Sequence, residues 1–339
     1  MSMSGRAGRH SKQTIQPAPR NQIEAMTQTR CHSVLDRPNP SVRRWLGSAF
    51  ATTLILLLGL AKVQAEPPTP LLWQVGDDDR HFYLVGSFHL LTADDYPLAD
   101  SLEAAYAGAE RLVFEISPEE ALSPAVATAM STRGMLPADR SLTSMISPDT
   151  RQRLIGFLGS EAALPTVDRL KPWFLTLGIA ISAMTQAGFD AQHGLDMHFM
   201  QRARSDGKTT LGLETAQQQI DALDSAPIEE QERSLREALR PLPELREEIH
   251  TLHRYWRTAD LARLEQEMWA ELVAETPVSA RLLNSDRNRR WLPQLQALIA
   301  DGTPTLVVVG TLHLVGDDGL PALLTAEGIS VRPVGRSTP

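Results

Sequence analysis

The fold is decided by the stretch TLVVVGTLHL at residues 305–314. Its first half, 305–309, is a continuous apolar run, which predicts a strand buried on both faces of a sheet. The run stops at Gly310, and a glycine allows the backbone to turn sharply after a strand. We therefore expect a buried strand that ends in a turn carrying His313.

Nearly the same phrase stands near the other end of the chain, where residues 83–90 read YLVGSFHL. Each phrase consists of strand residues, a glycine, a hydroxyl residue, an apolar residue, a histidine and a leucine. The two Gly-x-x-His turns place His89 and His313 after two different strands. A single histidine after a strand is commonly structural, but the repetition of the phrase favours a shared site.

The rest of the pattern predicts an α/β fold with a central mixed β-sheet surrounded by helices and a large helical insertion. Helices alternate with short apolar runs, and the middle of the chain, about 118–206, is mostly helical. The further predicted strands are 71–75, 81–85, 111–116, 208–213 and 329–334. The further predicted helices are 98–109, one from Ser147, 171–187, 193–204, several over 217–272, 285–300 and 319–326.

Two of the predicted strands end on carboxylates, Glu115 and Glu214. Ligand sites of α/β sheets gather beyond the carboxyl ends of strands, so these residues and the two histidines are candidates for one site. Two imidazoles with one or two carboxylates form a common ligand set for a catalytic divalent metal with an open position. Such a metal, here Mn, Fe, Co or Zn, makes hydroxide available near neutral pH.

Each candidate also has a structural interpretation. Glu115 and Glu214 each precede a helix start, at Ser117 and Thr215. Their only role could be to cap those helices. Arg287 begins the arginine-rich run RNRR and could belong to a solvated helix face. Alternatively, it could bind an oxyanion or a substrate carboxylate.

Four other histidines carry weaker signals. His250 and His253 have the i, i+3 spacing of a helical metal pair, but their charged surroundings favour a surface interpretation. His193 and His198 flank Asp196 and are ambiguous. The chain contains no P-loop, no Gly-x-Gly-x-x-Gly phrase and no Gly-x-Ser-x-Gly elbow.

Residues 1–65 read as a leader. A basic segment is followed by an apolar run over 46–60 and by small residues at Val63 and Ala65, a pattern typical of a signal peptide cleaved after Ala65. A retained membrane anchor is the alternative, although the run is short for a span. We expect a periplasmic or otherwise extracytoplasmic protein whose functional domain is 66–339. The membrane would be a partner only through an uncleaved leader.

Cysteine usage and charge narrow the chemistry of that domain. The one cysteine, Cys31, lies in the leader, so no disulfide or thiolate site is expected after cleavage. The leader holds 9 of the 33 basic and 2 of the 41 acidic residues, which leaves a net charge of −15 over 66–339. A strongly acidic surface repels nucleic acid, so no nucleic-acid partner is expected.

At this point the chain resembles the TraB/PrgY/GumN family, whose wider superfamily includes the Tiki proteases and relatives of erythromycin esterase and ChaN. The resemblance covers about 71–334. The phrases that carry it are LWQV, YLVGSFHLL, the FE of LVFEIS, HGLDMHFMQRA, LGLET, SDRNRRWLPQL and VVVGTLHLVGDDGL.

The resemblance implies an erythromycin-esterase-like or ChaN-like α/β fold and a divalent-metal-dependent peptidase. It implies that His89 and His313 are metal ligands or catalytic bases with Glu115 beside them. The other matching phrases contain Asp196, a further candidate ligand, and the candidate catalytic residues Glu214 and Arg287.

Three hypotheses follow. The leading one is an exported, divalent-metal-dependent hydrolase of the Tiki type that acts on a peptide or another small substrate. The second is a metal-binding or haem-binding protein without catalysis that uses the same histidines. The third is a metal-free, esterase-like hydrolase in which His89 is a general base. The sequence predicts no oligomeric state.

Overall fold

A six-stranded mixed sheet forms the centre of the part of the chain that the computed structural model describes, residues 66–335. The strand order is β4-β3-β5-β2-β1-β6. The strands are β1 (Leu72–Gly76), β2 (His81–Ser87), β3 (Arg111–Ile116), β4 (Thr209–Glu214), β5 (Thr305–Gly310) and β6 (Val331–Pro333). The predicted α/β class is confirmed, whereas the predicted signal peptide lies outside the described residues.

Four neighbouring strands are parallel, and this brings their carboxyl ends to one edge. β5 pairs with β2 on one side and with β3 on the other, and β3 pairs with β4. In this register Ser87 lies opposite Gly310, and Phe114 opposite Val308. β1 is antiparallel to both β2 and β6, so the sheet is mixed.

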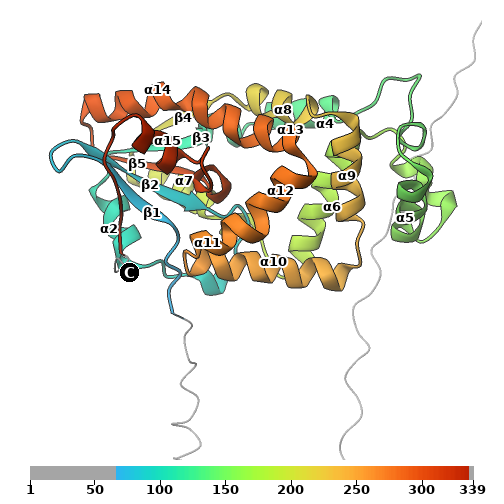
Figure 1. Ribbon diagram of the computed structural model, residues 1–339, viewed down its shortest axis with the longest axis horizontal. Helices are drawn as coiled ribbons and strands as arrows, with labels where there is room; N and C mark the ends of the chain where they lie inside the picture. Colours follow the sequence, from blue (N-terminus) through green and yellow to red (C-terminus); the bar gives the residue numbers. More distant parts are fainter. Residues whose placement is uncertain (1–65, 336–339) are drawn as a thin grey trace, which may run out of the picture. The chain divides into compact units, whose positions relative to one another are not determined.

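Helices surround this sheet (Figure 1). The α-helices are α2 (Asp100–Gly108), α3 (Pro118–Ala121), α4 (Pro124–Arg133), α5 (Pro148–Leu158), α6 (Pro172–Gln186), α7 (Leu195–Asp206), α8 (Ala216–Asp224), α9 (Ile228–Ala238), α10 (Leu242–Arg257), α11 (Leu261–Leu264), α12 (Ala270–Glu275), α13 (Pro277–Ala280), α14 (Asp286–Asp301) and α15 (Leu320–Ala326). Short 3-10 turns are η1 (Ala93–Asp95), η2 (Leu142–Ser144), η3 (Glu161–Thr166), η4 (Ala191–His193) and η7 (Thr311–Leu314), and π-helical turns are η5 (Glu265–Trp269) and η6 (Arg281–Ser285).

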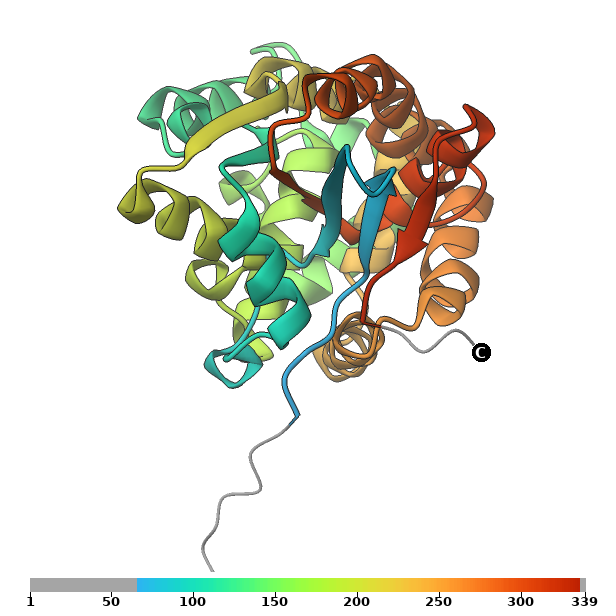
Figure 2. The same cartoon turned by 90° about the vertical axis from the view of Figure 1, so that its left-hand side faces the viewer.

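The two faces of the sheet are covered by different helices, because side chains alternate along each strand. On β5, Leu306 and Val308 pack with residues of α2 and α7. Val307 and Val309 face the other way and pack with residues of α14 and α15. Figure 2 shows these helices on either side of the strands. Every residue of β5 is buried, as its apolar run predicted.

The helical insertion has a hydrophobic core of its own. Leu154 of α5, Ile179 of α6 and Leu235 of α9 belong to one buried cluster separate from the two at the sheet. The predicted start of α5 is confirmed, since the Ser147 hydroxyl accepts a hydrogen bond from the Thr150 amide and a proline follows it. Within residues 66–335, no helix has both the length and the apolar character needed to cross a bilayer.

One surface interpretation is wrong. His253 of α10 is 9% exposed, and its Nε2 hydrogen-bonds the carboxylate of Asp95, whose side chain is fully buried. Its ring stacks on Trp256 and contacts Phe88. His250, one turn earlier, is exposed as expected. Although His250 and His253 are only three residues apart, one lies on the surface and the other in the core. They therefore do not form a metal-binding pair.

Candidate active site

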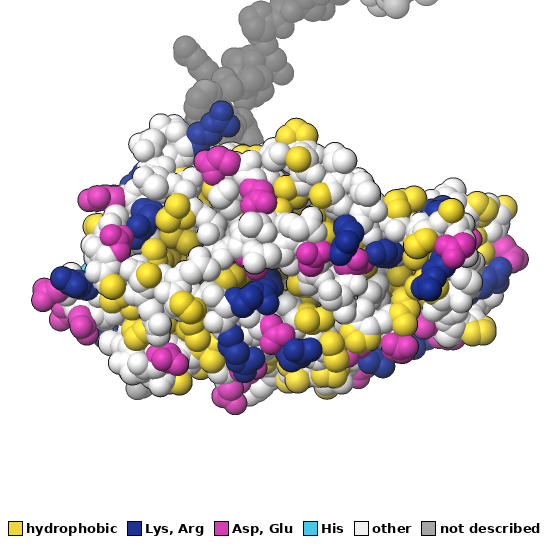
Figure 3. Space-filling view, turned by 90° about the horizontal axis from the view of Figure 1, so that it is seen from above, with side chains coloured by type: hydrophobic (Ala, Val, Ile, Leu, Met, Phe, Trp, Pro, Cys, Tyr) yellow, Lys and Arg dark blue, Asp and Glu magenta, His cyan; other side chains and the backbone are white. Residues whose placement is uncertain are grey.

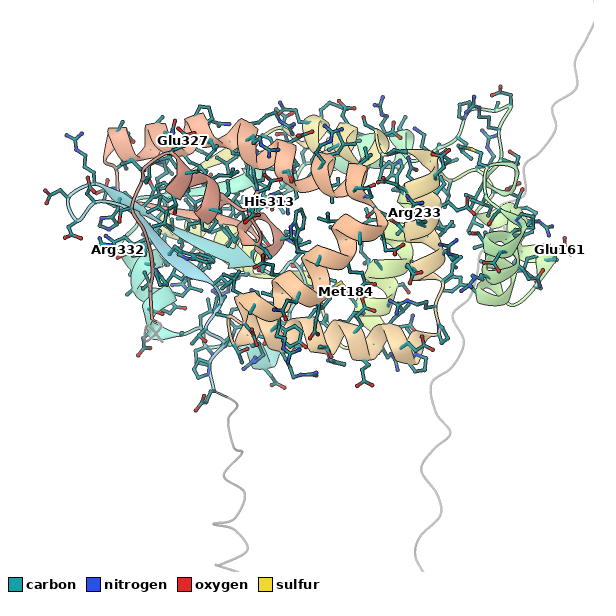
Figure 4. The ribbon with its side chains drawn as sticks, viewed as in Figure 1. Glu161, Met184, Arg233, His313, Glu327 and Arg332 are labelled. Carbon is teal, nitrogen blue, oxygen red and sulfur yellow. The ribbon has the colours of Figure 1, made fainter. Side chains whose placement is uncertain are left out.

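The carboxyl edge of the parallel strands brings the predicted residues together around one arginine. Arg287 of α14 donates hydrogen bonds to Glu115 at the end of β3 and to Glu214 at the end of β4. It also hydrogen-bonds Nε2 of His313, which lies 3.7 Å from Oε1 of Glu115. His89 follows β2, the strand on the other side of β5. Figure 4 labels His313 in the turn just beyond the sheet.

The two Gly-x-x-His turns are packed directly against each other. The Thr311 hydroxyl donates to the carbonyl oxygen of Ser87 at 2.9 Å, and both groups are buried. A Cβ added to Gly86 would lie 2.9 Å from the Thr311 hydroxyl oxygen and 2.9 Å from a methyl carbon of Leu314. Neither Gly86 nor Gly310 has a positive φ angle. These glycines therefore provide space rather than an unusual backbone conformation.

His89 is held by a carboxylate and reaches solvent. Its Nδ1 donates to Oδ2 of Asp196 at 2.8 Å, and Oδ1 of Asp196 accepts from the Ser87 hydroxyl. The negative charge of Asp196 raises the pKa of His89 above its ordinary value. The His89 side chain is 62% exposed, so it forms the accessible side of the site.

His313 is the buried counterpart, with a side chain that is 6% exposed. Its Nδ1 lies 2.6 Å from Oδ1 of Asn288, and its ring packs against Trp291 with centroids 4.5 Å apart. Burial lowers the pKa of His313 to about 3, although the charge of Glu115 opposes this change. This histidine is therefore neutral near pH 7.

Glu115 lies between the two histidine turns. Its Oε1 accepts from the Gly310 amide at 2.7 Å, and its Oε2 accepts from Gln219 and Arg287. Burial favours the neutral acid, but the positive charges of Arg287 and His89 and the hydrogen bond from the Gly310 amide outweigh it and hold the pKa of Glu115 well below its ordinary range. The carboxylate is thus ionised and fixed by hydrogen bonds at both oxygens.

Arg287 is an internal residue rather than part of a solvated face. Its side chain is 6% exposed, and its remaining hydrogen bond goes to the carbonyl oxygen of Leu283. All five N–H groups of a guanidinium are thereby used by described residues. Burial lowers the pKa of Arg287, but Glu115 and Glu214 outweigh this and raise it. In this arrangement it organises carboxylates and offers no free donor to an oxyanion.

One carboxylate oxygen remains free. Oε2 of Glu214 is buried and has no hydrogen-bond partner among residues 66–335, and the nearest ion-pair partner is Arg290 at 3.8 Å. Arg290 itself is 48% exposed. Figure 3 looks onto α14 and α8, where basic and acidic side chains are interspersed.

The donor types suit a divalent cation, but the predicted ligands are not equivalent. A Cβ on Gly310 would lie 3.1 Å from Oε1 of Glu115 and 3.4 Å from Nε2 of His89, so the glycine keeps space where these atoms approach each other. Asp196 stands behind His89, with both oxygens already engaged. In the structure of residues 66–335, no three His, Asp or Glu side chains are arranged so that together they could hold a metal ion.

Several site residues were not predicted. Asn288 follows Arg287 directly, and Gln219 lies one turn into α8. Ser87 and Thr311 are the hydroxyl residues of the repeated phrase, and that repetition was a signal that could have identified them. The other histidines of residues 66–335, at positions 81, 193, 198, 250 and 253, make none of the hydrogen bonds of this cluster.

A π-helical turn immediately precedes α14, and such turns are frequent at functional sites. Within it, Asn284 donates to the carbonyl oxygen of Leu312 and accepts from Asn288.

A pocket of about 430 Å³ opens nearby, beside Ser117 and Ala216, which follow β3 and β4. A second pocket of about 570 Å³ lies in the helical insertion. Neither pocket is lined by His89, Glu115, Glu214, Arg287 or His313.

The similarity of this chain to known proteins extends over most of its length. The TraB/PrgY/gumN family model matches residues 71–333. The uncharacterized protein YbaP of Escherichia coli (strain K12) is 26% identical over 260 residues, which cover 73% of this chain and 88% of YbaP. YbaP of Shigella flexneri is similar to the same extent. No solved structure gives a significant match. Since the family match extends over more than half of its length, the chain belongs to the TraB/PrgY/gumN family.

Proposed function

We propose that this protein is an exported hydrolase that uses a divalent metal held between its two Gly-x-x-His turns, and that its substrate is a peptide or another small molecule. The observation that carries the proposal is the placement of the Glu115 carboxylate beside both histidine turns. Nδ1 of His89 and Nδ1 of His313 each have a side-chain oxygen as partner. This anchoring by a second residue is typical of histidines that bind metal through Nε2.

Nε2 of His89, Nε2 of His313 and Oε1 of Glu115 would hold the ion. Asp196 would then orient His89 instead of binding the metal itself. A divalent cation at this place supplies Lewis acidity, which makes hydroxide available near neutral pH and polarises a carbonyl. Binding requires His89 to release its Nε2 proton, so metal affinity depends on pH.

The remaining residues supply a proton acceptor and rigidity. Oε2 of Glu214 is the buried carboxylate oxygen without a described hydrogen-bond partner, so we assign it as the general base. Arg287 holds Glu115 and Glu214 in place and neutralises part of their charge. The exposed His89 side marks the direction from which a substrate would enter.

The test combines metal analysis with substrate cleavage. The exported protein, purified from cells that produce the full chain, is analysed by inductively coupled plasma mass spectrometry. It is then incubated with a peptide library in the presence of Mn, Co, Fe or Zn. We expect near-stoichiometric metal and cleavage in the wild type, and loss of both in His89→Ala/His313→Ala. Cleavage that survives either single substitution overturns the proposal.

A matched control is His250→Ala, which removes an exposed histidine of α10 and should change neither metal content nor cleavage. Glu115→Gln keeps the size of the side chain but removes its charge, and we expect it to abolish cleavage. Circular dichroism of each variant separates loss of function from loss of fold.

A metal-free hydrolase is the second candidate, and the His313 contact favours it. Arg287 already donates to Nε2 of His313, the atom that a metal would need. His89, with its raised pKa and its Asp196 partner, would then act in proton transfer. Full cleavage after exhaustive chelation, lost in His89→Ala, would select this candidate. Tight metal or haem uptake without any cleavage would instead select a binding protein.

A further inference from the structure

Asn288 lies fully buried in the first turn of α14, directly behind the ring of His313. Its side-chain nitrogen lies within hydrogen-bond distance of three oxygen atoms. They are the carbonyl oxygen of Asp318 at 2.8 Å, Oδ1 of Asn284 at 2.9 Å and the carbonyl oxygen of His313 at 3.2 Å.

These neighbours determine which way the Asn288 amide points. Both carbonyl oxygens can only accept hydrogen bonds. The side-chain nitrogen of Asn284 donates to the carbonyl of Leu312, so Oδ1 of Asn284 faces Asn288 as an acceptor too. A flipped Asn288 amide would place its own oxygen against three acceptors. Its Oδ1 must therefore face His313.

The amide orientation in turn determines the proton on the imidazole. Oδ1 of Asn288 is an acceptor, so Nδ1 of His313, 2.6 Å away, must carry the hydrogen. Nε2 of the same ring lies 3.0 Å from a guanidinium nitrogen of Arg287, which can only donate. This second contact independently requires a lone pair on Nε2, so both sides of the ring give the same tautomer.

We propose that Asn288 is a positioning residue that holds His313 as the Nδ1–H tautomer and directs its Nε2 lone pair towards Glu115 and Arg287. The corresponding partner of His89 is Asp196, a charged acceptor. His313 thus presents an acceptor atom and no N–H to the site, which leaves His89 as the one proton-donating ring of the pair. The catalytic value of this assignment rests on the proposed function, whereas the tautomer can be measured without it.

The test uses long-range ¹H–¹⁵N correlation spectra of the chelator-treated full chain carrying ¹⁵N-histidine. The His313 signals are identified by their loss in His313→Ala. At pH 7, we expect a protonated Nδ1 and an unprotonated Nε2. A wild-type ring with its proton on Nε2 overturns the proposal, whether or not any variant folds.

Variants then test the role of Asn288. Asn288→Ala removes the acceptor of the Nδ1–H group while the Arg287 contact stays. We therefore expect the Nδ1 proton signal of His313 to shift upfield and to exchange faster with water. Gln294→Ala is the matched control, because it removes another amide of α14 that bonds Leu213 instead. An Nδ1 proton signal that keeps both its chemical shift and its exchange rate in a folded Asn288→Ala protein overturns the assignment.

Kinetics separate this inference from the proposed function. If the protein is a hydrolase, Asn288→Ala should lower kcat by roughly 10–100-fold with little change in KM, as expected when the partner of a site histidine is removed. If no substrate is cleaved, the proposed function fails while the tautomer measurement still decides the role of Asn288.

Discussion

The Thr311 hydroxyl donates a hydrogen bond to the carbonyl oxygen of Ser87 across 224 residues of sequence. This contact joins the two Gly-x-x-His turns. It continues through the Ser87 hydroxyl to Asp196, and from there to His89. The hydroxyl residue of each repeated phrase is therefore part of the hydrogen-bond network that joins the two turns and reaches His89.

Thr311→Val tests this connection, because valine has nearly the same shape but no hydroxyl. We expect a loss of about 1 kcal/mol in the free energy of unfolding, the usual net value of one hydrogen bond, together with reduced turnover. Urea denaturation measures the first and substrate cleavage the second. Thr325→Val, which removes an exposed hydroxyl on α15, should leave turnover unchanged.

Gly310→Ala tests the space between the turns. The backbone there suits alanine, with φ −55° and ψ 139°, but the added methyl would crowd Glu115 and His89. We expect kcat/KM to fall roughly tenfold or more while the fold persists, since small displacements at a site are costly. Gly178→Ala in α6 meets no neighbour within 4 Å and should keep full turnover. Full turnover in Gly310→Ala would contradict the proposed location of the site.

Arg287→Ala removes the partner of two buried carboxylates. Uncompensated buried charges are strongly destabilising, so we expect the free energy of unfolding to fall by about 3–5 kcal/mol. Arg290→Ala, at a side chain 48% exposed, should change it by less than about 0.5 kcal/mol. Equal effects of the two substitutions in chemical denaturation would show that the Arg287 network contributes little.

Asp196→Asn should lower the pKa of His89, because the carboxylate charge is the main cause of its elevation. A histidine whose pKa is raised on folding stabilises the fold below its unfolded pKa, near 6.5, and loses this contribution as the pH rises through its folded pKa. An NMR titration of His89 in both proteins measures the change. Asp190→Asn, which alters a nearby helix cap, is the control.

Asp95→Asn tests the buried pair of Asp95 and His253, which lies behind the first Gly-x-x-His turn. Burial alone would raise the pKa of Asp95, but hydrogen bonds from His253 and Thr92 outweigh it and lower the pKa to about 2. The stabilisation is therefore present above the unfolded pKa, near 3.9, and is lost as the pH falls through about 2. The wild type should lose its stability advantage over Asp95→Asn between about pH 4 and pH 2 in urea titrations. A constant difference over this interval would contradict the role of the charge.

The sequence by itself determined the sheet and the positions of the chemically active side chains along it. Apolar runs and glycines are local signals, so β2 and β5 and the turns that follow them could be predicted. Parallel strands bring their carboxyl ends to one edge, and this general rule was enough to expect Glu115 near His89 and His313.

Only the tertiary structure decided what each side chain does there. Arg287 reads as a surface residue in its charged segment, yet it meets Glu115 across 172 residues. His253 likewise finds Asp95 158 residues away and becomes a core residue. Burial and hydrogen-bond partners depend on segments far apart in the chain, so no local pattern contains them. In the same way, Nε2 of His313 is an acceptor because Asn288 and Arg287 lie on the two sides of the ring, and only the folded chain places them there.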